Sequence, residues 1–87
     1  MARGTPRLKP DGKMNVVGVR LKARRLELGD TQDAVCARIS MITDGGWIPD
    51  RRDLFKIESQ IRLVTDAEVI AIAQALPCGI EWLLVGK

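Results

Sequence analysis

Apolar positions recur at helical spacing along most of the chain and predict a series of short helices. Val17, Leu21 and Leu28 fall on one face of a first helix that we expect over residues 15–28. Gly29 follows it directly, where a helix often ends on a glycine.

A second helix is expected to begin after Thr31, which has the side chain of an N-cap residue. Its inward stripe is Val35, Cys36 and Ile39. The sequence DGG at 44–46 must end this helix.

A third helix is predicted over residues 51–60, with Asp50 as its N-cap. Leu54, Ile57 and Ile61 have the spacing of its buried stripe.

Two further helices complete the pattern. Thr65 and Glu68 have the spacing of a capping box, in which each side chain bonds the backbone of the other residue. The helix they open carries the inward residues Val69, Ile72, Ala73 and Leu76. Pro77 ends it, and a short fifth helix over 79–85 contributes Ile80, Leu83 and Leu84. We expect an all-α fold, a compact five-helix bundle without strands.

The first 13 residues contain two prolines, two glycines and scattered charge, with no apolar period. They predict a flexible basic N-terminal arm over residues 1–14, followed by a single domain over residues 15–87.

Composition agrees with packed helices. Apolar residues make up 46% of the chain, but the only aromatic residues are Phe55 and two tryptophans, Trp47 and Trp82, so the core must consist of Leu, Ile, Val and Ala. No apolar run approaches the roughly 20 residues that span a membrane, and the basic N-terminus lacks the apolar segment of a signal peptide. We expect a soluble, cytoplasmic protein.

Charge is distributed unevenly along the chain. Residues 1–25 hold eight basic side chains and one acid, a net +7, whereas residues 26–87 hold six basic and ten acidic side chains, a net −4. Two interpretations remain open: a basic surface presented to a polyanion, or a solubilising tail followed by a solvated helix face.

Catalytic and metal chemistry have little support. The chain has no histidine and only two cysteines, which argues against metal sites, His-based catalytic triads and a disulfide scaffold. We expect Cys36 and Cys78 to be small packed residues. Paired acids, phosphate loops and nucleophile elbows are also missing from the sequence, so we expect neither an enzyme nor a bound cofactor or metal.

Several stretches, taken in order, resemble the Cro/cI-type helix-turn-helix DNA-binding domain of phage repressors (the XRE-like family). They are RRLELGDTQDAVCARI at 24–39, LFKIE at 54–58, IAIAQAL at 70–76 and GIEWLLVG at 79–86. The chain departs from the family in carrying about eight extra residues, around 41–48, before the third helix. A subset of the family is similar here too, with the GW pair at 46–47 and RLVTD at 62–66.

The resemblance implies that the third helix lies in the major groove of double-stranded DNA. It places base-reading residues at Arg51, Arg52 and Lys56, with Asp53 between them able to accept from a cytosine amine or to hold Arg52. Without the resemblance, these residues are better explained as the solvated face of any helix.

The resemblance also implies phosphate contacts near the start of the second and third helices and in the following loop. The candidates are Thr31, Gln32, Asp50 and Arg62. Arg25 and Glu58 match a structural ion pair of the family, whereas Arg20 and Arg24 are expected to be exposed. The basic residues of the arm either wrap the duplex or enter a minor groove, or they have no role. These residues are Arg3, Arg7, Lys9 and Lys13.

The expected function is therefore transcriptional regulation by a homodimer bound to a palindromic operator, because one such module reads few bases. Trp82, Leu84 and Val85 are candidates for the dimer contact. The alternative is an antitoxin-like module whose main partner is another protein, contacted through residues 45–48. Gln60 stands where a glycine often ends the third helix.

Overall fold

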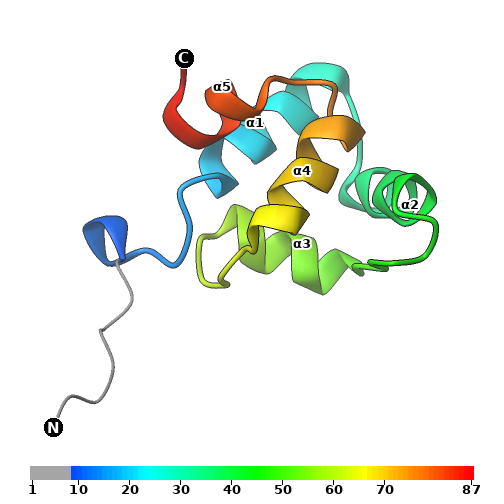
Figure 1. Cartoon of the computed structure of the whole chain (residues 1–87), viewed down its shortest axis with the longest axis horizontal. Helices are drawn as coiled ribbons and strands as arrows, with labels where there is room; N and C mark the ends of the chain where they lie inside the picture. The colour runs from blue at the N-terminus through cyan, green and yellow to red at the C-terminus, as the bar shows by residue number, and fades with distance from the viewer. Residues whose placement is uncertain (1–8) are drawn as a thin grey trace, which may run out of the picture.

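The computed structural model describes residues 9–87, and in this part of the chain the fold is a bundle of five α-helices without strands (Figure 1). A 3₁₀ turn, η1 (Pro10–Gly12), precedes the bundle. The helices are α1 (Gly18–Leu28), α2 (Gln32–Ile42), α3 (Arg51–Glu58), α4 (Asp66–Ala75) and α5 (Ile80–Val85). The expected all-α architecture is confirmed. The flexible arm was expected over residues 1–14, of which 1–8 lie outside the described residues.

The core lies where α2 packs against α3 and α4, with α1 against α3 and α5 against α4. Every helix contributes a fully buried aliphatic side chain, and Leu76 directly after α4 adds another. The residues from the helices include Leu21, Val35, Ile39, Leu54, Ile57, Ile72 and Leu83. The inward stripes predicted for the second and fourth helices are therefore confirmed. Burying these chains away from water is the main stabilising contribution to such a bundle.

The start of α1 differs from the prediction, because the helix begins at Gly18 and not at residue 15. Asn15 is buried just before it and links two parts of the fold. Its Oδ1 accepts a hydrogen bond from the Gly18 backbone N–H (2.9 Å), and its Nδ2 donates to the carbonyls of Ile57 (3.2 Å) and Arg62 (2.8 Å). Asn15 therefore holds the end of α3 against the beginning of α1.

The end of α3 also differs, since the helix stops at Glu58 and does not reach residue 60. Gln60 has a φ of 62°, in the left-handed region that ends helices and favours glycine. Its side chain donates to the Asn15 carbonyl at 3.0 Å, which ties this turn to the segment before α1. Because the chain turns here, Ile61 leaves the predicted stripe and is 59% exposed.

Three other predicted inward residues are exposed: Leu28, Ile80 and Leu84. Leu28 lies in the last turn of α1, and the other two lie on the outer side of α5. Helical spacing identifies a face, but how far the neighbouring helices cover that face depends on how they cross.

The segment between α2 and α3 is anchored to the bundle by hydrogen bonds. The Thr43 hydroxyl donates to the Ile39 carbonyl (2.9 Å) and accepts from the Trp47 backbone N–H (3.1 Å). Trp47 packs against the core, and Pro49 is buried immediately before α3. This anchoring fixes the position from which α3 begins.

Candidate nucleic-acid interface

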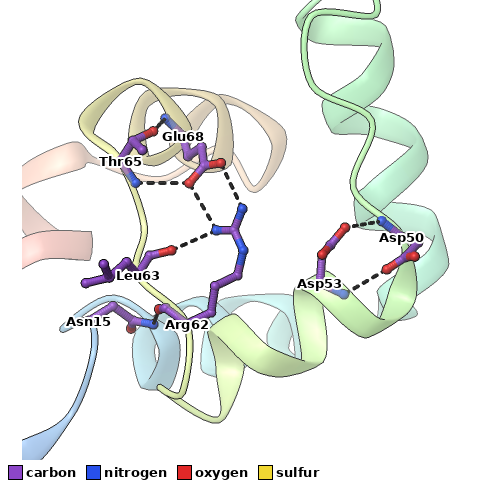
Figure 2. Close-up of polar contacts among 7 residues, drawn as sticks. All are labelled: Asn15, Asp50, Asp53, Arg62, Leu63, Thr65 and Glu68. Atoms are coloured by element: carbon purple, nitrogen blue, oxygen red, sulfur yellow. Dashed lines mark hydrogen bonds and ion pairs between the residues drawn. The ribbon is translucent and has the colours of Figure 1, made fainter.

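The beginning of α3 is held by a reciprocal capping box (Figure 2). The Asp50 carboxylate accepts from the Asp53 backbone N–H at 2.8 Å, and the Asp53 carboxylate accepts from the Asp50 backbone N–H at 3.0 Å. The bond from the Asp53 backbone is the main reason that the pKa of Asp50 is lowered. The N-cap predicted at Asp50 is confirmed. Asp53 has a role in the cap itself, and in the described part of the chain no hydrogen bond or ion pair joins it to Arg52.

The exposed face of α3 carries three basic side chains. Arg51 and Arg52 follow the cap directly and Lys56 lies one turn later, and all three are exposed. The capping box determines where the helix starts, and therefore which side chains its first turn presents to solvent.

Arg51 is held by an acidic side chain of α2. Its Nη2 lies 2.6 Å from Asp33 Oδ2, and its Nε donates to Asp33 Oδ1 at 3.3 Å. Both side chains are well exposed, 69% for Arg51 and 60% for Asp33. The hydrogen bond from Arg51 lowers the pKa of Asp33, so this carboxyl stays ionised through the neutral range. The two residues are 18 positions apart, so no local sequence pattern indicates this pair.

An open groove of about 620 Å³ runs between the N-terminal ends of α2 and α3. It is lined by Gln32, Asp33, Asp50, Arg51, Arg52 and Phe55. Phe55 is 54% exposed and stands one helical turn after Arg51. This aromatic residue was missed as a site residue, although its position on the polar face of the third helix was a usable signal.

The N-terminus of α2 is tied to α1 and α3 by a buried polar network. Glu58 accepts from Arg25 Nε (2.6 Å), Arg25 Nη2 (3.1 Å) and Gln32 Nε2 (3.0 Å). The Arg25 and Glu58 side chains are only 10% and 4% exposed, so the ion pair expected from the resemblance is present and buried. The Thr31 hydroxyl caps α2 by accepting from the Ala34 backbone N–H at 3.0 Å. Thr31 and Gln32 therefore lie beside the groove, each with a bonding partner inside the protein.

Arg62 is bonded within the domain, although it was predicted to contact phosphate. Its guanidinium makes two hydrogen bonds of 3.0 Å to Glu68 and one of 2.8 Å to the Leu63 carbonyl (Figure 2). It also lies 5.7 Å from the centre of the Trp47 ring, at the distance of a cation–π contact. These contacts join the loop after α3 to the start of α4 and favour a structural role for Arg62.

Several arginines that contribute to the sequence charge are also occupied internally. Arg20 donates to the carbonyls of Leu83 (3.0 Å) and Leu84 (2.8 Å), and Arg24 donates to those of Leu76 (3.0 Å) and Pro77 (3.1 Å). The expectation that Arg20 and Arg24 are simply exposed was wrong: they cap the C-terminal ends of α5 and α4, where cations are stabilised. The basic character of residues 1–25 is therefore partly structural.

The arm residues divide into two groups. Lys9 and Lys13 are exposed beside η1, whereas Arg3 and Arg7 lie outside the described residues. The backbone N–H of Met14 donates to the Gln60 carbonyl at 3.0 Å, so the arm joins the bundle at the end of α3.

The described part of the chain contains no cluster of three or more His, Cys, Asp or Glu side chains able to hold a metal ion. It also contains no helix long and apolar enough to cross a membrane. Cys36 is buried, and this burial raises the pKa of its thiol to about 11, as expected for a packed residue. Trp82, a candidate for the dimer contact, is half-buried against the core.

Comparison with solved structures identifies the fold. No protein-family model matches the chain, and no curated protein sequence matches it significantly. The chain is structurally similar to the P22 c2 repressor protein, in a crystal structure of that protein in complex with synthetic operator 9T in the presence of Tl⁺. The TM-score is 0.67 at 22% sequence identity, over 84% of this chain and 98% of that one. This five-helix domain therefore has the phage-repressor fold of the P22 c2 repressor structure.

Proposed function

We propose that this protein binds double-stranded DNA sequence-specifically and regulates transcription, with α3 in the major groove. The observation that carries the proposal is the exposed basic face at the start of α3, formed by Arg51, Arg52 and Lys56 and held in place by the Asp50 capping box. The similar fold of the P22 c2 repressor, whose structure contains a synthetic operator, supports DNA binding.

Contacts to base edges and contacts to phosphates have different consequences for binding. Arginine donates in a fixed fork that matches the O6 and N7 acceptors of guanine, and a good pair of this kind contributes about 1–3 kcal/mol of discrimination. We assign this reading to the basic face of α3. The N-terminus of α2, at Thr31 and Gln32, offers backbone N–H groups and a positive dipole end to a phosphate. Such contacts orient the protein on DNA without reading its sequence.

A homodimer on a palindromic site is part of the proposal. An apolar depression of about 300 Å³ lies between α4 and α5 and is lined by Asp66, Val69, Ile70, Ile80 and Leu84. Val85 is exposed on the same short helix. Association of two copies through this face doubles the number of bases read and removes apolar surface from water.

A protein-binding function of the antitoxin-like kind has one observation in its favour. Ile48 is 71% exposed in the segment between α2 and α3, and Met41 is exposed at the end of α2. Trp47 in the same segment packs on the core and is not available as a large contact residue. We therefore rank DNA binding first.

The deciding experiment is selection from a pool of random duplexes, followed by binding measurements over a range of salt concentrations. DNA binding predicts an enriched palindrome containing guanine and a steep fall in affinity with salt. Arg52→Ala and Lys56→Ala should relax the preference at individual base pairs, whereas Lys13→Ala should weaken all duplexes alike. Failure to enrich any sequence at moderate salt would reject the proposal in favour of a protein partner.

A further inference from the structure

An exposed carboxylate stands on the surface that we propose faces DNA. Asp33 lines the groove between α2 and α3 and is 60% exposed. It is not the N-cap of α2, because the Thr31 hydroxyl fills that position. The other acidic residue that lines this groove, Asp50, is engaged in the capping box of α3. Asp33 therefore needs a different explanation, since a carboxylate at this place repels DNA phosphates and lowers affinity.

The geometry of its ion pair gives that explanation. Asp33 accepts from Arg51 along one side of the guanidinium, through Nε (3.3 Å) and Nη2 (2.6 Å). The other edge of the guanidinium, formed by Nη1 and the second N–H of Nη2, makes no hydrogen bond to the residues that the structure describes. That end-on edge is a pair of parallel donors, which is the pattern that guanine O6 and N7 accept.

We infer that Asp33 is a positioning residue that orients Arg51 for end-on reading of one guanine. The inference rests on the proposed function. A long arginine side chain loses rotamer freedom when it docks, and an ion pair formed in the unbound protein removes part of that loss in advance. The carboxylate also repels phosphates at every sequence, and the orientation of Arg51 offsets that cost only where a guanine accepts from it. Asp33 therefore lowers the affinity for all DNA and increases the difference in affinity between sequences.

Because Asp33 both orients Arg51 and repels phosphates, its removal should affect overall affinity and sequence discrimination in opposite directions. Asp33→Ala removes the orienting acceptor and a negative charge together. Binding to a scrambled duplex should be at least as tight as for the wild type, whereas discrimination should fall at the base pair read by Arg51. A residue that only supports the fold would instead weaken binding to every duplex.

The test begins with the preferred duplex selected by the wild-type protein. Arg51→Ala first identifies the base pair at which that side chain discriminates, by roughly 5- to 150-fold if it reads guanine bidentately. Asp33→Ala and Asp33→Asn are then measured on that duplex, on the three duplexes altered at this pair, and on a scrambled sequence. We expect Asp33→Ala to lose most of the discrimination at this pair alone. Asp33→Asn should lose less, because its amide retains one acceptor.

Asp44→Asn is the matched control. This substitution also removes one exposed carboxylate. Asp44 lies beyond the opposite end of α2 from Asp33, and α2, with 11 residues, is about 16 Å long. The φ of Asp44, 53°, is one that asparagine tolerates. This variant should keep the wild-type discrimination at every base pair.

Two outcomes separate the inference from the function on which it rests. If the wild type enriches a sequence but Asp33→Ala keeps full discrimination at the Arg51 base pair, or loses it equally at all pairs, the positioning role is rejected and DNA binding stands. If the wild type enriches no sequence, both are rejected. The Arg51 Nε–H resonance in NMR spectra of the unbound protein provides a check without DNA: it should shift in Asp33→Ala and not in Asp44→Asn, and an unchanged resonance contradicts the ion pair.

Discussion

Replacing Gly18 by alanine should destabilise the protein, although helix propensity alone predicts the opposite. Gly18 is the first residue of α1, and alanine is favoured over glycine by about 1 kcal/mol inside a helix. A Cβ at this position, however, would lie well inside van der Waals contact with the Ile57 carbonyl oxygen. It would also lie 3.0 Å from Gln60 Cγ and 3.1 Å from Asn15 Oδ1. Backbone oxygen cannot move aside as a flexible side chain can, so α1 and the end of α3 must separate.

The magnitude follows from two contributions. Overpacking a tight contact costs about 1–3 kcal/mol, and displacing the Ile57 carbonyl also weakens its hydrogen bond from Asn15, which contributes about 0.5–1.5 kcal/mol. These two costs sum to about 1.5–4.5 kcal/mol, and the gain in helix propensity offsets about 1 kcal/mol of them. We therefore expect Gly18→Ala to lower the free energy of unfolding by about 0.5–3.5 kcal/mol, compared with the roughly 5–15 kcal/mol typical of small domains.

Urea denaturation followed by circular dichroism at the helix band measures this change. Ala23→Gly, at an exposed site within the same helix, is the control for propensity and should cost about 1 kcal/mol. A Gly18→Ala protein as stable as the wild type, or more stable, would refute the close approach of α1 to the end of α3.

Three other predictions concern buried groups. Glu58→Gln should lower the free energy of unfolding by about 3–5 kcal/mol, because it leaves the buried charge of Arg25 without its counter-ion. A loss below about 1 kcal/mol in the same urea experiment would mean that the pair contributes no more than a surface ion pair. The pKa of Glu68 is held below its ordinary value mainly by the hydrogen bond from Arg62. Since the pKa in the folded state is the lower one, the stability that this pair contributes is fully present above the unfolded value of about 4.3 and is lost as pH falls through the folded value. Glu68→Gln should therefore be less stable at pH 7 and show a flatter loss of stability in acid, and an unchanged acid slope would contradict this assignment. Burial raises the pKa of the Cys36 thiol to about 11 and also raises that of Cys78, which is only half-buried. An alkylating reagent at pH 8 should modify Cys78 first in the folded protein and both thiols in urea; faster modification of Cys36 would contradict its burial.

The helices and their caps were predictable because their determinants are local. Thr31, Asp50 and Thr65 each bond a backbone N–H three residues further along the chain, so the starts of α2, α3 and α4 were visible in a few consecutive letters. Apolar periodicity likewise identified the buried faces of α2 and α4. The weaker predictions were at helix ends, where α3 stopped at Glu58 because Gln60 adopts a positive φ that its residue type does not announce.

The availability of charged side chains was decided by the tertiary structure. Arg20 bonds carbonyls more than 60 positions away, Arg24 bonds carbonyls more than 50 positions away, and Arg51 meets an acid on another helix. A count of charges in the sequence assigns each of these arginines a positive charge. The partner that each one contacts depends on how the helices cross, and the spacing of apolar residues along the sequence does not specify those crossings. The sequence by itself therefore determined where a basic face begins on α3. Only the folded bundle determined which cations remain exposed on that face and which hold the bundle together, because that depends on distances between atoms that are remote along the chain.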